Sequence, residues 1–141
     1  MPSTRLETDR LILRAPEQEM AEPIVWYFLR NRGFLQPFEP PYELDFFTVA
    51  RQSESIQKSM DAWREDRRYW FWLYKKQRTE RVIGGVGLSN IVRGAFQSCF
   101  LGYRLDEGEI NKGLMTEAVR RIVEFGFDEL KNLYSQLGTL S

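Results

Sequence analysis

The sequence predicts an α+β protein in which helices flank a mostly antiparallel sheet. Three observations lead to this fold class: β-rich runs joined by short turns in the middle of the chain, an amphipathic helical pattern near its end, and two helical patterns after the first β-rich run. With 141 residues, 43% of them hydrophobic, the chain can bury a sizeable core, and we expect a single domain over residues 1–141.

The first expected elements are a strand and a helix. Residues 8–15 (TDRLILRA) alternate loosely and are rich in Leu and Ile, which predicts a strand. Residues 18–30 carry apolar side chains at helical spacing, but Pro23 permits a helix only if it starts late or kinks there. Residues 31–41 (NRGFLQPFEPP) contain three prolines and one glycine, which predicts an ordered loop or short turns.

The middle of the chain is expected to form a polar helix followed by three strands. Residues 48–66 place Val, Ile, Met and Trp on one helical stripe, and residues 69–74 (YWFWLY) read as a strand covered on both faces. Strands over residues 82–91 and 98–105 follow after short turns, which predicts an antiparallel meander. The glycines in VIGGVGLSNI indicate a β-bulge or the close approach of another backbone.

The clearest helical pattern covers residues 112–130. Apolar side chains recur there at helical spacing, so one face must be buried against the meander.

Composition excludes several classes of site. The 20 basic and 20 acidic residues balance, so no direct nucleic-acid partner is expected, and the absence of histidine excludes histidine-based catalysis and most zinc or iron sites. Cys99 is the only cysteine, so no internal disulfide can form, and a strand position favours a core role for it over a nucleophilic one. No signal-peptide core and no membrane-spanning run is present, and we expect a cytoplasmic protein without a metal or a membrane partner.

The junction at residues 105–118 (LDEGEINKGLMTEA) has features of an anion site. A helix start offers free backbone N–H groups and a partial positive charge, Gly113 allows close approach, and Lys112 supplies a cation. Asn111 tolerates left-handed backbone and is also a good N-cap. A simple capped turn explains the same residues, and the acidic neighbours Asp106, Glu107 and Glu109 would repel an anion unless they point away.

Several segments together carry a family resemblance. SNIVRGAFQSCFLGYRLDE followed by KGLMTEA resembles the acetyl-CoA-binding core of the GNAT acetyltransferase superfamily. LETDRLILRAP and NRGFLQPFEP resemble, more narrowly, the branch that acetylates the N-terminal alanine or serine of ribosomal proteins. The resemblance runs in order from about residue 6 to residue 130.

The resemblance implies transfer of an acetyl group from acetyl-CoA to an amine, with a protein or peptide N-terminus as the acceptor. The pyrophosphate would bind backbone N–H groups of residues 111–115, and the pantetheine arm would pair with residues 103–105 like an added strand. The cofactor-binding residues implied in this way are Tyr103, Arg104, Leu105, Asn111, Lys112, Gly113, Leu114 and Met115.

The chemistry does not need histidine. An α-amino group has a pKa of about 8, so part of it is neutral at pH 7, and a weak base acting through water suffices. Glu39, in the loop motif PFEP of the resemblance, is the candidate catalytic base, although a solvated loop carboxylate is the simpler interpretation. A strand N–H near Gly102 or Tyr103 is the candidate oxyanion donor, and Phe34 and Phe38 either shape a peptide groove or pin their loop.

The chain departs from the family in two places. Ile110 and Asn111 stand where the family usually has Gln or Arg and then Gly, so weaker cofactor affinity is expected. After Leu130 the family continues with further strands, so this chain is expected to be C-terminally truncated, and no role is assigned to Tyr134. The open sheet edge would then be covered by a second copy in a homodimer. The alternative function is a catalytically impaired GNAT-like remnant that acts through oligomerisation or CoA binding.

Overall fold

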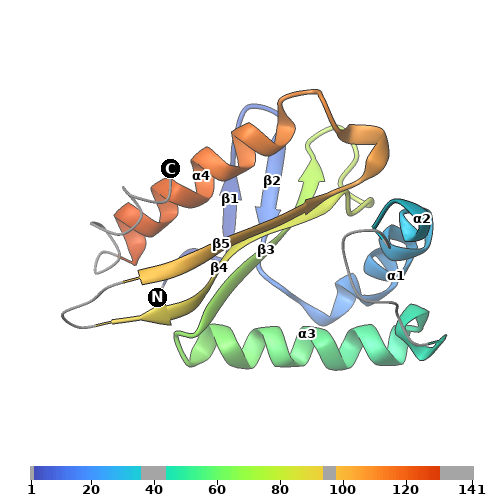
Figure 1. Cartoon of the computed structure of the whole chain (residues 1–141), viewed down its shortest axis with the longest axis horizontal. Helices are drawn as coiled ribbons and strands as arrows, with labels where there is room; N and C mark the ends of the chain where they lie inside the picture. Colours follow the sequence, from blue (N-terminus) through green and yellow to red (C-terminus); the bar gives the residue numbers. More distant parts are fainter. Residues whose placement is uncertain (1, 36–43, 94–97, 131–141) are drawn as a thin grey trace.

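The computed structural model describes residues 2–35, 44–93 and 98–130, which form one five-stranded antiparallel sheet with helices on both faces (Figure 1). The strands follow one another in the order β1–β2–β3–β4–β5. They span β1 (Arg5–Glu7), β2 (Leu11–Arg14), β3 (Arg68–Lys75), β4 (Gly84–Val92) and β5 (Ser98–Leu105). The helices span α1 (Ala21–Arg30), α2 (Arg32–Leu35), α3 (Val49–Arg64) and α4 (Leu114–Glu129), with short 3₁₀ turns at Gln18–Met20, Leu44–Phe47 and Glu107–Glu109. The predicted α+β class is therefore confirmed.

The boundaries at the start of the chain differ from the prediction. The segment predicted as one strand contains a turn and then β2, which pairs with β1. β1 escaped prediction because it is only three residues long and buries a single side chain, Leu6. Helix α1 starts late, as Pro23 required, and places this proline in its first turn, where no backbone hydrogen bond is lost. The short helix α2 lies within the predicted loop.

The sheet buries one cluster of apolar side chains on each face. Tyr69, Phe71 and Leu73 of β3 point to the face covered by α4, where Phe125 packs 5.1 Å from the Phe71 ring. The alternate residues of β3, with Trp70 among them, point to the face covered by α1 and α3. All six residues of YWFWLY are buried, so the predicted strand covered on both faces is confirmed.

The glycines of β4 allow a neighbouring strand to pack against its backbone. A methyl group at Gly85 would lie 2.1 Å from the Trp70 ring, and one at Gly87 would lie 2.5 Å from the carbonyl oxygen of Tyr69. The predicted close approach is confirmed, whereas the pairing irregularity of this strand lies further along, between Ser89 and Val92. Trp70 therefore lies flat over β4, on the α1/α3 face.

Strand β5 forms one edge of the sheet over the described part of the chain, and its residues Phe100 and Tyr103 are 63% and 62% exposed. Cys99, on the same strand, is buried in the α4-side cluster, where burial raises the pKa of its thiol. Its predicted core role is confirmed. None of the helices in the described ranges has the length and apolar character needed to cross a bilayer.

Candidate functional site

The link between β5 and α4 contains two residues with left-handed backbone. The φ angle is 63° at Asn111 and 78° at Gly113. Asparagine and glycine tolerate this conformation better than other residues do. The predicted left-handed backbone of Asn111 is confirmed, but its alternative role as N-cap is wrong, because Gly113 is the N-cap and α4 begins at Leu114.

The first turn of α4 presents backbone N–H groups that have no partner within the helix. The first bond of the helix runs from the N–H of Glu117 to the carbonyl oxygen of Gly113, at 3.2 Å, and the N–H groups of residues 114–116 precede it. The helix dipole adds a partial positive charge at the same place. We call residues 111–116 the anion cradle. Thr116 belongs to it and was not among the residues predicted from sequence.

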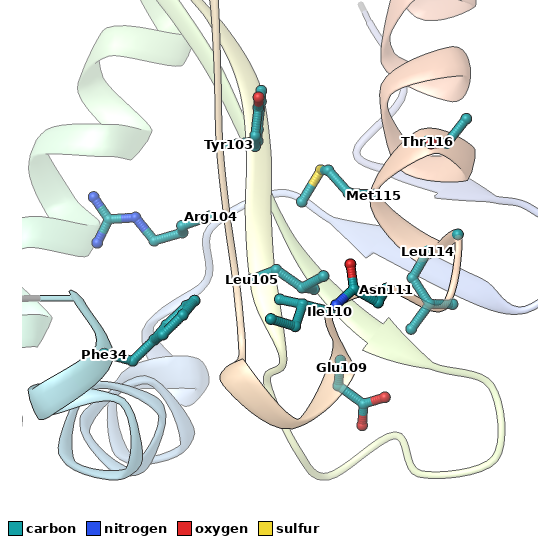
Figure 2. A pocket seen from close by; sticks show the side chains of 11 residues that line it. Phe34, Tyr103, Arg104, Leu105, Glu109, Ile110, Asn111, Leu114, Met115 and Thr116 are labelled. Atoms are coloured by element: carbon teal, nitrogen blue, oxygen red, sulfur yellow. The ribbon is translucent and has the colours of Figure 1, made fainter. Parts of the chain in front are cut away.

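A groove of about 580 Å³ opens beside the anion cradle (Figure 2). Its walls come from α2, β5, the link and α4, namely Phe34, Tyr103, Arg104, Leu105, Glu109, Ile110, Asn111, Gly113, Leu114, Met115 and Thr116. Seven of the eight residues predicted to bind the cofactor are in this lining, and Lys112 is the exception. Tertiary structure thus brings the end of β5 and the start of α4 to one concave surface.

Lys112 does not line the groove, and its ammonium group is engaged in an ion pair. It pairs with the Glu109 carboxylate at 3.2 Å, and this carboxylate also pairs with Lys75 at 2.8 Å. Burial by itself would raise the pKa of Glu109, but the two lysines outweigh it and hold the pKa below its ordinary value. Glu109 is therefore neutralised by its partners, and the charge of Lys112 is paired with it, while the predicted role of Lys112 stays a prediction.

Asp106, the most buried carboxylate near the cradle, is also neutralised. It accepts hydrogen bonds from the Arg30 guanidinium at 2.8 and 3.1 Å and from the N–H of Gly108 at 3.0 Å. Burial raises its pKa, but these hydrogen bonds and the charge of Arg30 outweigh burial, so the pKa lies below its usual value. The repulsion of an anion expected from this acidic stretch is reduced accordingly.

A clamp from the turn between β1 and β2 holds the link in place. The Arg10 side chain donates to the Glu117 carboxylate at 2.9 Å and to the carbonyl oxygen of Lys112 at 3.0 Å. The backbone N–H of Arg10 also donates to Glu117, at 2.9 Å, and the Thr8 hydroxyl donates to the same carboxylate. We call Thr8, Arg10 and Glu117 the loop clamp. Because Arg10 and Glu117 are 107 residues apart in the chain, no local sequence rule could have paired them.

The open edge of β5 offers main-chain groups to an extended ligand. One edge of this strand pairs with β4, in the register Gly84 with Leu105 and Val86 with Tyr103. No strand within the described residues pairs with its other edge. The end of β5 and the anion cradle line the same groove, so an extended chain ending in phosphates fits the arrangement.

Three residues singled out from sequence lie outside the described residues: Glu39, Phe38 and Tyr134. Phe34 is described; it packs against the α1/α3-side cluster and also lines the groove, so both roles considered for it are compatible with its position. Gly102 faces open space, since a methyl group there would meet no atom within 4 Å. Over the described ranges, histidine, cysteine, aspartate and glutamate form no group of three that could hold a metal ion.

Comparisons of the sequence with a family model and with known proteins agree on one family. Residues 10–139 match the model of the acetyltransferase (GNAT) domain. A probable N-acetyltransferase of Bacillus subtilis, YjcK, is 36% identical over 126 residues, which are 89% of this chain and 69% of that protein. The ribosomal protein uS5-alanine N-acetyltransferase of Escherichia coli is 30% identical over 125 residues, which are 89% of this chain and 64% of the relative.

Solved structures agree with the sequence matches. The ribosomal-protein-S5-alanine acetyltransferase of Vibrio fischeri superposes with a TM-score of 0.84 at 28% identity, covering 92% of this chain and 70% of the other. More distant structures with the same fold, at 19% and 21% identity, are complexes with a CoA disulfide or with acetyl-CoA and AMP. The chain spans about two thirds of the length of the relatives it matches.

Proposed function

This chain belongs to the GNAT acetyltransferase family, and on that premise we propose that it transfers the acetyl group of acetyl-CoA to the N-terminal amine of a protein. A ribosomal protein that begins with alanine or serine is the expected acceptor, because two relatives are named for the acetylation of an alanine on ribosomal protein S5. The family match fixes the acetyl-CoA-dependent N-acetyltransferase class of the domain. The activity of this chain and its acceptor are the proposal.

The anion cradle is the observation that carries the proposal. The pyrophosphate of acetyl-CoA would accept hydrogen bonds from the N–H groups of residues 113–116, at the positive end of α4. The left-handed backbone at Asn111 and Gly113 shapes the cradle, and the loop clamp keeps it in place through the carbonyl group of Lys112. Two solved structures with this fold, one with a CoA disulfide and one with acetyl-CoA and AMP, support acetyl-CoA as the ligand of the cradle.

The edge of β5 would hold the rest of the co-substrate. The pantetheine arm carries amide groups that can pair with the main chain of residues 103–105 as an added strand does. With the pyrophosphate in the cradle, this direction places the thioester near Gly102, where the structure has open space.

The transfer itself needs little from ionisable side chains. The neutral amine attacks the thioester carbonyl, a carbon–nitrogen bond forms as the carbon–sulfur bond breaks, the amine loses a proton and the CoA thiolate takes one up. A main-chain N–H of β5 near Gly102 or Tyr103 would stabilise the oxyanion. Glu39 is proposed to accept the proton of the amine through water, and an α-amine with a pKa of about 8 makes that demand small.

Acetyl-CoA binding and transfer test the proposal separately. At a ligand concentration of about 100 times Kd, a specific ligand stabilises a protein by roughly 2.7 kcal/mol, which a thermal-shift assay detects readily. Incubation with a peptide beginning with alanine should add one acetyl group, detected by mass spectrometry. Stabilisation without transfer would favour the alternative role as a CoA-binding remnant, and no stabilisation would refute the proposal.

We also propose that a second copy covers the open edge of β5 outside residues 103–105, which would hold the co-substrate, in a homodimer. An exposed edge strand with apolar side chains such as Phe100 is a liability in water. The molar mass in solution, measured with and without acetyl-CoA, tests this: a single monomeric species in both conditions would contradict it. The cytoplasmic location stays a prediction from sequence.

A further inference from the structure

A second set of polar groups lies on the other side of β5 from the anion cradle. The Arg68 guanidinium lies 4.8 Å from the centre of the Trp70 ring, and the Arg104 guanidinium lies 5.9 Å from the centre of the same ring. Trp70 lies over the glycines of β4, so the three side chains meet on the α1/α3 face of the sheet. We call Arg68, Trp70 and Arg104 the arginine shelf.

The charge of Arg68 is not neutralised within the described part of the chain. Its guanidinium donates to the Ser59 hydroxyl at 3.2 Å and stacks on Trp70, but no carboxylate in the described ranges pairs with it. Burial and the neighbouring Arg104 both lower its pKa, yet an arginine stays charged at neutral pH. A half-buried cation without a counter-ion is unfavourable, and an anion that reaches Arg68 would stabilise it.

Trp70 adds an independent sign of a missing partner. Its side chain is only 7% exposed, and its indole N–H is buried without an acceptor among the described residues. Buried donors are nearly always satisfied by protein, water or ligand. The arginine shelf thus contains both an unsatisfied donor and an unneutralised cation.

The arginine shelf adjoins the place proposed for the thioester. Arg104 belongs to the segment of β5 that lines the groove, and Figure 2 shows its side chain pointing away from Met115, towards the side on which Phe34 lies. Gly102, two residues earlier on the same face of β5, borders open space. A peptide that presents its amine at this point would place its next residues over the shelf.

We propose that the arginine shelf binds a carboxylate in the first few residues of the acceptor peptide, so that the enzyme prefers acidic N-termini. The inference rests on the proposed function for the position of the amine. A planar guanidinium that stacks on an aromatic ring is well suited to hold a carboxylate by two hydrogen bonds.

The test compares two labelled peptides that differ only in charge, Ala-Glu-Glu-Gly-Ser and Ala-Gln-Gln-Gly-Ser. Their affinities are measured by fluorescence anisotropy in the presence of saturating CoA, which cannot react. Wild type should bind the acidic peptide about tenfold more tightly, since a charge-assisted hydrogen bond to a carboxylate is worth that much. Equal affinity for the two peptides, or binding of neither, would overturn the inference.

Variants assign the preference to the arginine shelf. Arg68→Met should bring the two affinities to within about twofold, and Arg68→Lys should keep a preference of about threefold, because an ammonium retains charge but loses the planar fork. Arg67→Met is the matched control: Arg67 is the exposed neighbour whose charge pairs with Glu65, and its loss should leave the preference unchanged. Melting temperatures identify any variant that fails to fold. If Arg68→Met fails to fold, Arg68→Lys still tests the role of the guanidinium group.

Two outcomes separate this inference from its alternatives. A preference that survives in folded Arg68→Met would place the recognition elsewhere and refute the role of the shelf. Tighter binding of a short single-stranded oligonucleotide than of the acidic peptide, lost in Arg68→Met, would overturn it in favour of a nucleic-acid ligand. If acetyl-CoA fails to stabilise the protein while the peptide preference remains, the proposed function fails and the carboxylate site stands.

Discussion

The anion cradle and the arginine shelf lie on opposite sides of the same strand, and they treat charge in opposite ways. Around the cradle, the Glu109 and Asp106 carboxylates and the Lys112 ammonium are each paired with a partner within the protein. On the shelf, the Arg68 guanidinium has no such partner in the described ranges. The cradle therefore offers backbone N–H groups and the shelf offers side-chain charge.

The difference separates charged groups that hold the site in shape from charged groups that can bind a ligand. Ion pairs around the cradle fix the path of the link, and their charges are already neutralised, so a ligand gains little by contacting them directly. An unneutralised, half-buried cation gains from an external anion. The cradle can be disrupted through its backbone, its supports and its side chains.

The largest effect is expected from the backbone of the cradle. Gly113→Val puts a β-branched side chain at a φ of 78°, a backbone conformation that costs such a residue about 2 kcal/mol. Relief of this strain displaces the N–H groups of the first turn, so the affinity for acetyl-CoA should fall about thirtyfold. Isothermal titration calorimetry measures the change. Gly108→Ala is the control in the same stretch, because its methyl group would meet only the Asp106 carboxylate at 3.6 Å, and its affinity should match wild type.

The buried support of the link should respond to pH. The folded-state pKa of Asp106 lies below the ordinary 3.8, so its stabilising contribution is fully present above about pH 5 and is lost as the pH falls through the folded pKa. Asp106→Asn removes this contribution and leaves Arg30 without its anion, costing about 1.5 kcal/mol at pH 7. Urea unfolding at a series of pH values should show a shallower acid decline for the variant. Parallel curves would contradict the assignment.

The loop clamp is expected to matter less, because it is partly exposed. Glu117→Gln weakens the hydrogen bonds from Arg10 and loosens its hold on the Lys112 carbonyl group, which should lower affinity for acetyl-CoA about fivefold. Glu124→Gln makes the same substitution seven residues later in α4, where the carboxylate pairs with Arg121 at 3.7 Å, and should change nothing. Equal losses in both variants would point to the helix rather than to the clamp.

The smallest effect is expected at Asn111. The sequence predicts weaker cofactor affinity there, because the family usually has glycine. The structure gives Asn111 the left-handed backbone that glycine would adopt, so Asn111→Gly should change the affinity for acetyl-CoA by no more than about twofold. A large gain in affinity by the same titration would show that the asparagine side chain, not its backbone, obstructs the ligand.

The sequence was most informative where neighbouring residues decide the outcome. The aromatic run of β3 is buried on both faces as predicted, and the link before α4 has the left-handed residue and the free helix start that its composition indicated. The sequence was less informative where two residues could each be the N-cap of α4. Asn111 and Gly113 both suit a turn, and only the path of the link makes Gly113 the N-cap, with Lys112 turned towards Glu109.

The sequence by itself determined the fold class, because this depends on hydrophobic periodicity. Its quoted segments also carry the family resemblance, and that resemblance implied the residues of β5 and α4 that line the groove. Only the tertiary structure decided that Arg10 holds Glu117, that Asp106 is neutralised by Arg30 and that Arg68 and Arg104 meet over Trp70. Those contacts join residues that are distant in the chain. Their energies depend on burial and on the direction of charged groups in space, which the order of residues does not encode locally.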